Sequence, residues 1–440
     1  MSHVLTMALP MSLGIVLIML CQLVDLYFVG GLGDAAIAGV AAAGNAGFLI
    51  NAFTQVLSVG TVALVSHAVG RKDRSDANLV FNQALGLSVL CGIVALLAGW
   101  LLARVYVGSL AADQATIEAG TTYMLWFMPA LALQFTVLVM TGALRGTGVV
   151  RPAMLIQALT VVINIVLAPV LIVGWGTGHG FGVAGAGLAS SLAVMIGLAM
   201  LWIYLDRSGR YLVLDPSRWR PSLAQCRRIL RIGLPAGGEF AMVFVFMAVI
   251  YYALSDLGAA AQAGFGIATR LLGLIQVPAL AIAFAAGPII GQNFGAGDSA
   301  RVRATFRRVL LLETAIMLVA TMLAEWRPQS LLGVFTTDAD TIAVGATFLK
   351  LVSLNLVAQG VLFLCTATFQ GLGHTAPQLL SSATRLVTYA IPILFLSSRP
   401  WFRIEYIEYI WYASIATTSL QALLSLWLLR REFRKRLAAL

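Results

Sequence analysis

Apolar stretches long enough to cross a lipid bilayer recur along the whole chain, and they restrict its fold more than any other feature. A membrane-spanning helix needs roughly 20 consecutive, mostly apolar residues. Only 10% of the 440 residues are charged, whereas a water-soluble domain carries about 25%. We therefore expect an all-α membrane protein. Twelve stretches are predicted to span the membrane: 5–30, 35–69, 77–107, 120–144, 152–174, 183–205, 234–256, 259–291, 303–325, 340–370, 377–397 and 407–429.

Lys and Arg residues are distributed unequally between the two sides that these helices would define. On the side of the N-terminus lie 21 of the 28, in the loops 70–76, 145–151, 206–233 and 298–308 and in the tail from Arg430. The opposite side carries four, which are Arg104, Arg327, Arg399 and Arg403. Because cytoplasmic loops are enriched in Lys and Arg, we expect both termini in the cytoplasm. The expected location is the plasma membrane, which is the inner membrane of a bacterium.

The two halves of the chain repeat each other at a constant offset of 225 residues. Polar, Gly and Pro residues match without a gap, among them Pro10 with Pro235, Asp73 with Asp298, Asp113 with Asp338 and Pro152 with Pro377. The repeat predicts two pseudo-symmetric six-helix bundles, an N-terminal lobe (1–205) and a C-terminal lobe (234–440), joined by a cytoplasmic linker loop (206–233). Since each copy holds an even number of spans, both insert in the same orientation. Such a parallel repeat is typical of transporters that work by alternating access.

Asp25 is the clearest ionisable residue inside a predicted span. Groups of this kind are costly in hydrocarbon and are functional candidates for that reason. Cys21, Gln22 and Phe28 share its helix face at helical spacing. Removal from water disfavours the charged form of a carboxylate, so Asp25 could bind a proton from outside and release it when the site changes. The alternative is an aspartate that only hydrogen-bonds a neighbouring helix.

Further polar residues within the spans predict a substrate cavity. Gln157, Thr160 and Asn164 form a stripe at helical spacing, and the offset carries this stripe to a face that includes Arg385. The same face is therefore polar in both halves. The residues predicted to line the cavity are Gln22, Asn45, Gln134, Gln157, Thr160, Glu239, Arg270, Gln359 and Arg385.

Two glutamates of the second half are further candidates, and the first, Glu239, has no acidic counterpart because its equivalent is Gly14. Glu239 could be a second carboxylate for a cation or a substrate. Alternatively, it could form an ion pair with Arg270 or Arg385, because buried charges are normally paired. Glu313 follows the arginines at 307–308 within two turns, which predicts an ion pair at the membrane interface.

The sequence contains no pattern that indicates an enzyme, a metal site or a cofactor. The glycine-rich segments 174–182 and 291–297 do not match a phosphate-binding loop. The four cysteines have no paired spacing, and the histidines form no metal-ligand pattern. We expect no cofactor besides an ion gradient and no nucleic-acid partner. The expected partners are small-molecule drugs or metabolites and the lipid bilayer, around a monomer.

Several segments in both halves carry a family pattern. Among them are LVDLYFVGGLG (23–33), NIVLAPVLIVG (164–174), GLPAGGEF (233–240) and PIIGQNFGAGD (288–298). Together they make the chain resemble multidrug and toxic compound extrusion (MATE) transporters, and more closely the branch named for a DNA-damage-inducible protein (DinF-like). The resemblance covers essentially the whole chain. It implies exchange of amphiphilic compounds, including organic cations, for H⁺ or Na⁺.

The resemblance also implies an ion-coupling site. Asp25 matches the family's coupling carboxylate in the first span, and Asn164 matches its partner in the fifth. The family often has an acidic residue one turn after that asparagine, where this chain has Ala168. A hard cation such as Na⁺ needs several oxygen ligands. The departure therefore favours a single-carboxylate proton site, assisted by Ser190.

The leading functional hypothesis is a secondary active multidrug efflux antiporter that exchanges amphiphilic or cationic compounds for H⁺, with Na⁺ as the other possible ion. One alternative is a flippase for lipid-linked saccharides from the same superfamily. That function needs a basic cavity for phosphates, for which only Arg270 and Arg385 are available. An alternative from another class is an intramembrane enzyme such as a prenyl transferase. It would need paired carboxylates for Mg²⁺-pyrophosphate, whereas Asp25 stands alone in its helix.

Overall fold

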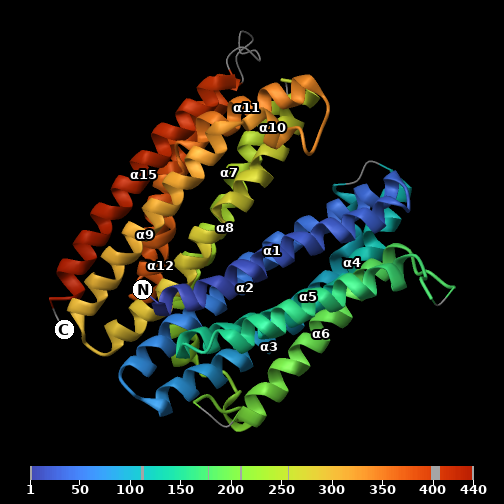
Figure 1. The fold of residues 1–440 in the computed structure, drawn as a ribbon. Helices are drawn as coiled ribbons and strands as arrows, with labels where there is room; N and C mark the ends of the chain where they lie inside the picture. Colours follow the sequence, from blue (N-terminus) through green and yellow to red (C-terminus); the bar gives the residue numbers. More distant parts are fainter. Residues whose placement is uncertain are drawn as a thin grey trace. The chain divides into compact units, whose positions relative to one another are not determined.

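The computed structural model describes residues 2–110, 113–176, 178–208, 211–255, 257–397 and 407–438, and the regular secondary structure in these ranges is helical (Figure 1). Arg399 and Arg403, two of the four basic residues predicted to lie on the side opposite the N-terminus, are outside these ranges. The helices of the first half are α1 (Ser2–Gly30), α2 (Asp34–Gly70), α3 (Arg74–Gly108), α4 (Gln114–Thr147), α5 (Arg151–Ile172) and α6 (Val183–Ser208). Those of the second half are α7 (Leu223–Ser255), α8 (Ala259–Gly295), α9 (Ser299–Trp326), α10 (Pro328–Leu332), α11 (Ala339–Ser353), α12 (Leu356–Gly371), α13 (Ala376–Arg385), α14 (Ile391–Ser397) and α15 (Ile407–Arg436).

Within the described residues, 11 helical segments are long and apolar enough to cross a membrane. A twelfth span results if α11 and α12 are counted as one, although the helix axis bends by 58° between them. The prediction of an all-helical membrane protein is therefore confirmed. Twelve spans agree with the structure when the bent pair is taken as one.

Two compact units make up the chain. The N-terminal unit is Leu13–Gly237, and the C-terminal unit is Met1–Ser12 with Gly238–Leu440. The two divisions fall inside α1 and α7, at positions that are equivalent at the offset of 225. The lobes expected from the sequence, 1–205 and 234–440, were instead bounded by the ends of predicted membrane spans. These boundaries stay a prediction.

In the N-terminal unit, α4 is the central helix. It packs against α2, α3 and α6, and α5 packs against α6 (Figure 1). Where α2 crosses α4, a Cβ atom added to Gly39 would lie only 2.6 Å from the backbone nitrogen of Gly120. The repeat recreates this crossing in the C-terminal unit, where a Cβ atom on Gly264 of α8 would lie 3.0 Å from the backbone nitrogen of Gly345 of α11. Small residues at such crossings let membrane helices approach closely.

Pro129 interrupts the hydrogen bonding of α4, and side chains from neighbouring helices replace what is lost. Proline has no N–H, so the carbonyl of Leu125 four residues earlier lacks its helical donor. The indole N–H of Trp100 donates to that carbonyl at 3.0 Å. The hydroxyl of Ser191 on α6 donates to the carbonyl of Trp126 at 2.6 Å and accepts from the backbone N–H that follows Pro129 at 3.1 Å. Because unpaired backbone groups are costly in hydrocarbon, these side chains allow α4 to continue.

The segment predicted as a linker loop, 206–233, is a loop only in part. Helix α7 begins at Leu223, and the preceding segment 211–222, which contains the short 3₁₀ turn η1 (Pro216–Arg218), is bound to α3. Three amide side chains of α3 donate to backbone carbonyls of this segment and accept from its backbone N–H groups, at 2.5–3.0 Å. These are Asn78, Asn82 and Gln83. The linker segment 211–222 therefore belongs structurally to the N-terminal unit.

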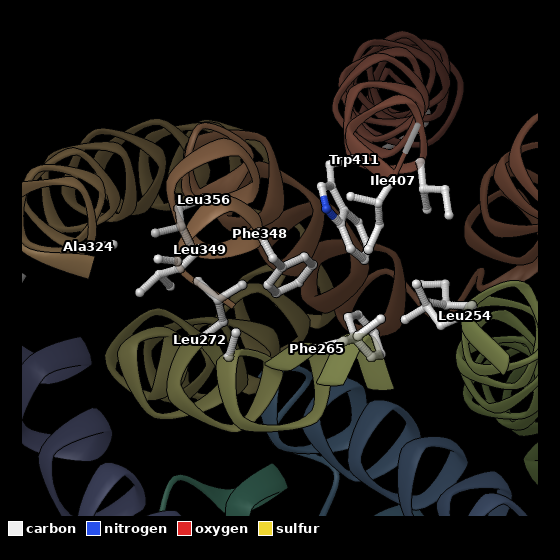
Figure 2. Packing of buried hydrophobic residues seen from close by; sticks show 14 of the residues in the cluster. Leu254, Phe265, Leu272, Ala324, Phe348, Leu349, Leu356, Ile407 and Trp411 are labelled. Atoms are coloured by element: carbon white, nitrogen blue, oxygen red, sulfur yellow. The ribbon is translucent and has the colours of Figure 1, made fainter. Parts of the chain in front are cut away.

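The C-terminal unit is built around α8, which packs against α9, α11 and α12. Its core contains an aromatic cluster of Phe265 from α8, Phe348 from α11 and Trp411 from α15 (Figure 2). Phe265 stacks on Trp411 with ring centroids 5.7 Å apart, and Phe348 meets Trp411 edge-on at 4.6 Å. Ring pairs of this kind contribute about 0.5–1.5 kcal/mol beyond the area they bury. They fix the positions of three helices in this unit.

Two predicted spans of the C-terminal unit are interrupted. The stretch 340–370 bends after Ser353, whose hydroxyl donates to the carbonyl of Lys350 at 2.9 Å. The next two backbone N–H groups bond three residues back instead of four, because the Ser353 hydroxyl competes for the carbonyl of Lys350, which the N–H of Leu354 would otherwise bond. The stretch 377–397 contains a π-helical turn, η2 (Leu386–Ala390), directly before α14. Pro392 in α14 cannot donate to the preceding turn, which favours this widening.

The crossing of α2 and α4 should not tolerate one added methyl group. In Gly39→Ala the new Cβ would lie within 3 Å of the backbone of α4, at 2.6 Å from Gly120 N and 2.9 Å from Thr116 O. Overpacking of this kind costs about 1–3 kcal/mol. We expect a clearly lower thermal unfolding midpoint for the purified variant in detergent. The matched control is Gly44→Ala in the same helix, where a Cβ would meet nothing within 4 Å, and equal midpoints for the two variants would contradict the close crossing.

Candidate functional site

Asp25 lies half-buried on α1 of the N-terminal unit, where a side chain of α5 reaches it and is itself bound by a residue of α6. Its Oδ1 is 3.2 Å from the side-chain amide of Asn164 on α5, and the other end of that amide is 3.1 Å from Oγ of Ser190 on α6. Asn164 and Ser190 are only 6% and 9% exposed. The thiol of Cys21, one turn earlier on α1, lies 3.9 Å from Asp25 Oδ2 and 3.2 Å from the Asn164 amide. The structure thus brings the three predicted ion-coupling residues together.

The Asn164 amide can satisfy its hydrogen bonds in two orientations, and the proton on Asp25 decides between them. With Nδ2 toward Asp25, the amide donates to a charged carboxylate, and its oxygen accepts from the backbone N–H and the hydroxyl of Ser190 at 3.3 and 3.1 Å. With Oδ1 toward Asp25, the amide accepts from a protonated carboxyl, and Nδ2 donates to Ser190 Oγ at 3.1 Å. The Ser190 hydroxyl then donates to the carbonyl of Ala186 at 3.3 Å. Reversal of one amide accommodates both states of the carboxyl.

The surroundings of Asp25 are mostly apolar, and they include the phenol of Tyr123. Val29, Ala168 and Ile172 belong to a small buried core at this end of the unit, against which Phe28 of α1 packs. None of the ion pairs found in the described ranges involves Asp25. Nor does the described part of the chain bring together three His, Cys, Asp or Glu side chains that could hold a metal ion. Asp25 is therefore a single carboxyl held by an amide and a thiol.

The other predicted cavity residues of the first half differ in their exposure. Gln22 and Asn45 are exposed on α1 and α2, whereas Gln134 and Gln157 are half-buried on α4 and α5. The hydroxyl of Thr160 donates to a carbonyl of its own helix at 2.9 Å. Their part in a substrate cavity stays a prediction.

In the C-terminal unit, Glu239, Gln359 and Arg385 line one cavity of about 360 Å³. Arg270, which was predicted to join them, is exposed on α8 and is not one of the residues that line this cavity. Three of the four polar residues predicted here are therefore brought together, and Arg270 lies elsewhere.

The ion pair considered for Glu239 is not formed. Its Oε1 accepts hydrogen bonds from the hydroxyls of Thr366 at 3.3 Å and Ser382 at 3.4 Å. None of the ion pairs between described residues includes Glu239 or either candidate arginine. Sequence reasoning missed Thr366, although a signal was present, because Thr366 matches Thr141 at the offset of 225.

The interfacial ion pair predicted for Glu313 is wrong. Glu313 is 0% exposed, and neither of its carboxyl oxygens has a hydrogen-bond partner in the part of the chain that the structure covers. Arg307 and Arg308 are exposed. They precede Glu313 by six and five residues, which at 3.6 residues per turn places them on other faces of α9.

An all-helical membrane protein with an internal repeat of this kind, and with polar groups buried in both halves, is built like a transporter. The profile of the MatE family matches the chain twice, over residues 10–170 and 235–396. The chain belongs to the MatE family, and it is a membrane transporter and not an enzyme. The two matched segments begin 225 residues apart, which is the offset of the internal repeat. Family membership excludes the intramembrane enzyme considered above.

Known relatives and solved structures are similar over nearly the whole chain. The multidrug export protein MepA of Staphylococcus saprophyticus is 24% identical over 428 residues, which are 96% of this chain and 92% of the relative. The FAD transporter of Shewanella oneidensis is 23% identical over 401 residues, 90% of this chain and 87% of the relative. The structure of a MOP superfamily transporter from Pyrococcus furiosus matches with a TM-score of 0.89 at 23% identity, covering 99% of this chain and 96% of that one. This last likeness shows the fold.

The contact between Asp25 and Asn164 should appear as an energetic coupling. Groups that share a hydrogen bond show interaction free energies of about 0.5–3 kcal/mol in double-mutant cycles. We expect a value in this range from the unfolding free energies of Asp25→Ala, Asn164→Ala and the double variant. The control cycle uses Thr160→Ala in place of Asn164→Ala. The hydroxyl of Thr160 bonds the backbone of its own helix, so this cycle should give a coupling free energy near zero. Equal values in both cycles would contradict the contact.

Proposed function

We propose that this transporter is a multidrug efflux antiporter that exports amphiphilic, cationic compounds in exchange for protons. The observation that carries the proposal is Asp25, a single carboxyl in apolar surroundings whose amide neighbour fits both of its protonation states. A carboxylate in such surroundings needs a compensating positive charge. Either a proton or a cationic compound can supply that charge. Because the proton and the cationic compound compete for one carboxyl, the transport of one is coupled to the transport of the other.

The coupling follows from the order in which the carboxyl is occupied. A proton that binds Asp25 from outside removes the negative charge, and the Asn164 amide reverses to accept from the new O–H group. The cation then loses its counter-charge and leaves toward the outside. When the site opens to the cytoplasm, release of the proton restores the carboxylate, which attracts the next cation. Ser190 keeps the amide bonded in both states.

A proton suits this site better than Na⁺ does. A hard cation needs several oxygen ligands at short distance. Next to a charged Asp25, the amide of Asn164 presents its nitrogen to the carboxylate and its oxygen to Ser190. Ala168, which replaces an acidic residue of the family pattern, adds no oxygen from the neighbouring core. We therefore assign H⁺ as the coupling ion.

The names of relatives support drugs as the passengers. MepA of Staphylococcus saprophyticus is a multidrug export protein, and a relative from Thermotoga maritima is named a probable multidrug resistance protein, NorM. A flippase for lipid-linked saccharides would need a basic cavity, and the exposed position of Arg270 removes one of its two candidate arginines. Assignment to the DinF-like branch, and a role for Gln22, Asn45, Gln134, Gln157 and Thr160 in the passenger's path, stay predictions.

Replacement of the coupling carboxyl should stop export driven by a proton gradient. Asp25→Asn keeps the size of the side chain but cannot exchange a proton, so we expect transport at least tenfold slower, which corresponds to about 1.4 kcal/mol or more. The measurement is uptake of ethidium, an amphiphilic cation, into proteoliposomes that are acidic inside. A sodium gradient alone should drive no uptake in the native protein.

The matched control for this test is Asp34→Asn, which removes an exposed carboxylate at the start of α2 and should leave the rate unchanged. The two variants should have the same thermal unfolding midpoint. Undiminished uptake by Asp25→Asn would remove Asp25 from the mechanism, and uptake driven by sodium alone would replace the proton as the coupling ion.

The distribution of Lys and Arg predicts both termini in the cytoplasm, in the plasma membrane, and we infer a monomer. Two exposed loop residues on opposite predicted sides test the orientation, Lys72 after α2 and Ser109 after α3. In a cysteine-free background, Ser109→Cys should react with a membrane-impermeant maleimide on intact cells, and Lys72→Cys only after the cells are opened. The reverse pattern would invert the proposed orientation.

A further inference from the structure

The cavity of the C-terminal unit has a composition that suits a ligand different from a cationic drug. Its volume of about 360 Å³ falls in the range of about 300–1,000 Å³ that is usual for small-molecule sites. It is bounded by side chains of α7, α8, α11, α12, α13, η2 and α15, so it lies within this unit. None of the three ion-coupling residues of the N-terminal unit takes part in it.

Aromatic rings form much of the wall. Phe265, Phe348 and Trp411 are held in the stacked and edge-on cluster of the unit's core (Figure 2). Phe246 of α7 and Tyr389 of η2 lie against each other at a centroid distance of 4.8 Å and line the same cavity. Rigid rings of this kind bind flat, apolar bodies with little loss of side-chain freedom.

Arg385 supplies the positive charge of this cavity. Its guanidinium lies over the ring of Phe246, with Cζ 4.2 Å from the ring centroid. No acidic side chain forms an ion pair with it among the residues described, and its Nε–H is buried without a hydrogen-bond partner. A guanidinium that stacks through its face keeps its edge donors available, and that edge matches a planar carboxylate.

The acidic residue of the cavity, Glu239, forms no ion pair with Arg385 among the described residues. Glu239 directs Oε1 to the hydroxyls of Thr366 and Ser382. Gln421 adds a neutral amide, which donates to Ser382 at 3.4 Å and has an unpartnered oxygen. It can orient a ligand but cannot balance a charge.

Two further donors of the cavity wall have no acceptor. The hydroxyl of Tyr389 and the indole N–H of Trp411 are buried without a hydrogen-bond partner, and both residues are 0% exposed. A buried donor left without an acceptor costs about 1–3 kcal/mol. Tyr389 follows Arg385 by four residues and belongs to the π-helical turn η2, a feature that is frequent at functional sites.

The geometry points to a second binding site in this transporter, in which the C-terminal unit takes a flat aromatic compound that carries a carboxylate. The carboxylate pairs with the edge of Arg385, assisted by the donors of Tyr389 and Trp411. The aromatic body lies among Phe246, Phe265 and Phe348. This site is independent of proton coupling at Asp25, and it makes the two halves of the molecule opposite in the charge they accept.

The test measures binding of 2-naphthoate to the full-length protein in detergent, by equilibrium dialysis against protein-free micelles. The neutral 2-naphthamide is the matched probe, since it has the same ring system without the charge. We expect 2-naphthoate to bind about tenfold more tightly than 2-naphthamide, because its hydrogen bonds are charge-assisted. Arg385→Gln should abolish this difference, and Arg385→Lys should retain part of it. Arg270→Gln, which removes an exposed arginine of the same unit, should change neither affinity.

Tyr389→Phe provides a second variant that removes a single hydroxyl, in case Arg385→Gln does not fold. It should weaken 2-naphthoate binding by about threefold and leave 2-naphthamide unchanged. Equal affinities of the two probes for the native protein would overturn the site. So would a preference for 2-naphthoate that survives both Arg385→Gln and Tyr389→Phe. Asp25→Asn should bind 2-naphthoate like the native protein, so loss of cation transport and loss of this site are separate outcomes.

Discussion

Polar groups that leave water must find partners inside the protein, and this requirement accounts for most of the irregular features of the structure. Pro129 can stand in the middle of α4 because Trp100 and Ser191 bond the backbone groups that it frees. The carboxyl of Asp25 is met by an amide that can turn either end toward it. Buried groups without such a partner occur at several places in the described part of the chain, among them the carboxyl oxygens of Glu313, and those of Arg385, Tyr389 and Trp411 differ in that their residues line one cavity.

The fold could be predicted to the extent that it follows from hydropathy and repetition. Long apolar stretches and matched turns determine where helices lie in each half, and the bilayer leaves few other structures available. The bend after Ser353 and the π-helical turn η2 could not be predicted in this way, because they arise from local competition for backbone hydrogen bonds. One hint existed, since Leu354 at the bend corresponds to Pro129 at the offset of 225. The chain is therefore irregular at equivalent positions of the two halves. The helix breaks between α11 and α12, at Leu354, whereas α4 continues through Pro129.

The structure brings predicted site residues together where the sequence offered a relation between helices, and it contradicts a prediction that considered one helix alone. Helical spacing alone could not place Asn164 and Ser190 beside Asp25; the resemblance to a family suggested that grouping. Glu313 was misjudged because its distance along α9 from the basic residues was counted in turns, while the direction of its side chain was not. For hydroxyl partners such as Thr366 of Glu239 the only sequence signal was the match with Thr141 in the repeat, and that match does not show which group the hydroxyl contacts.

The binding of segment 211–222 to α3 has a consequence for how the protein is made. Asn82 and Gln83 are 0% and 6% exposed, and the hydrogen bonds that satisfy their amides come from backbone synthesised more than 120 residues later. The helices of the first half can enter the membrane in order as they leave the ribosome, but two amides of α3 stay without these acceptors and donors in the meantime. Completion of the first half therefore waits for translation to reach Ser222, directly before α7 begins at Leu223.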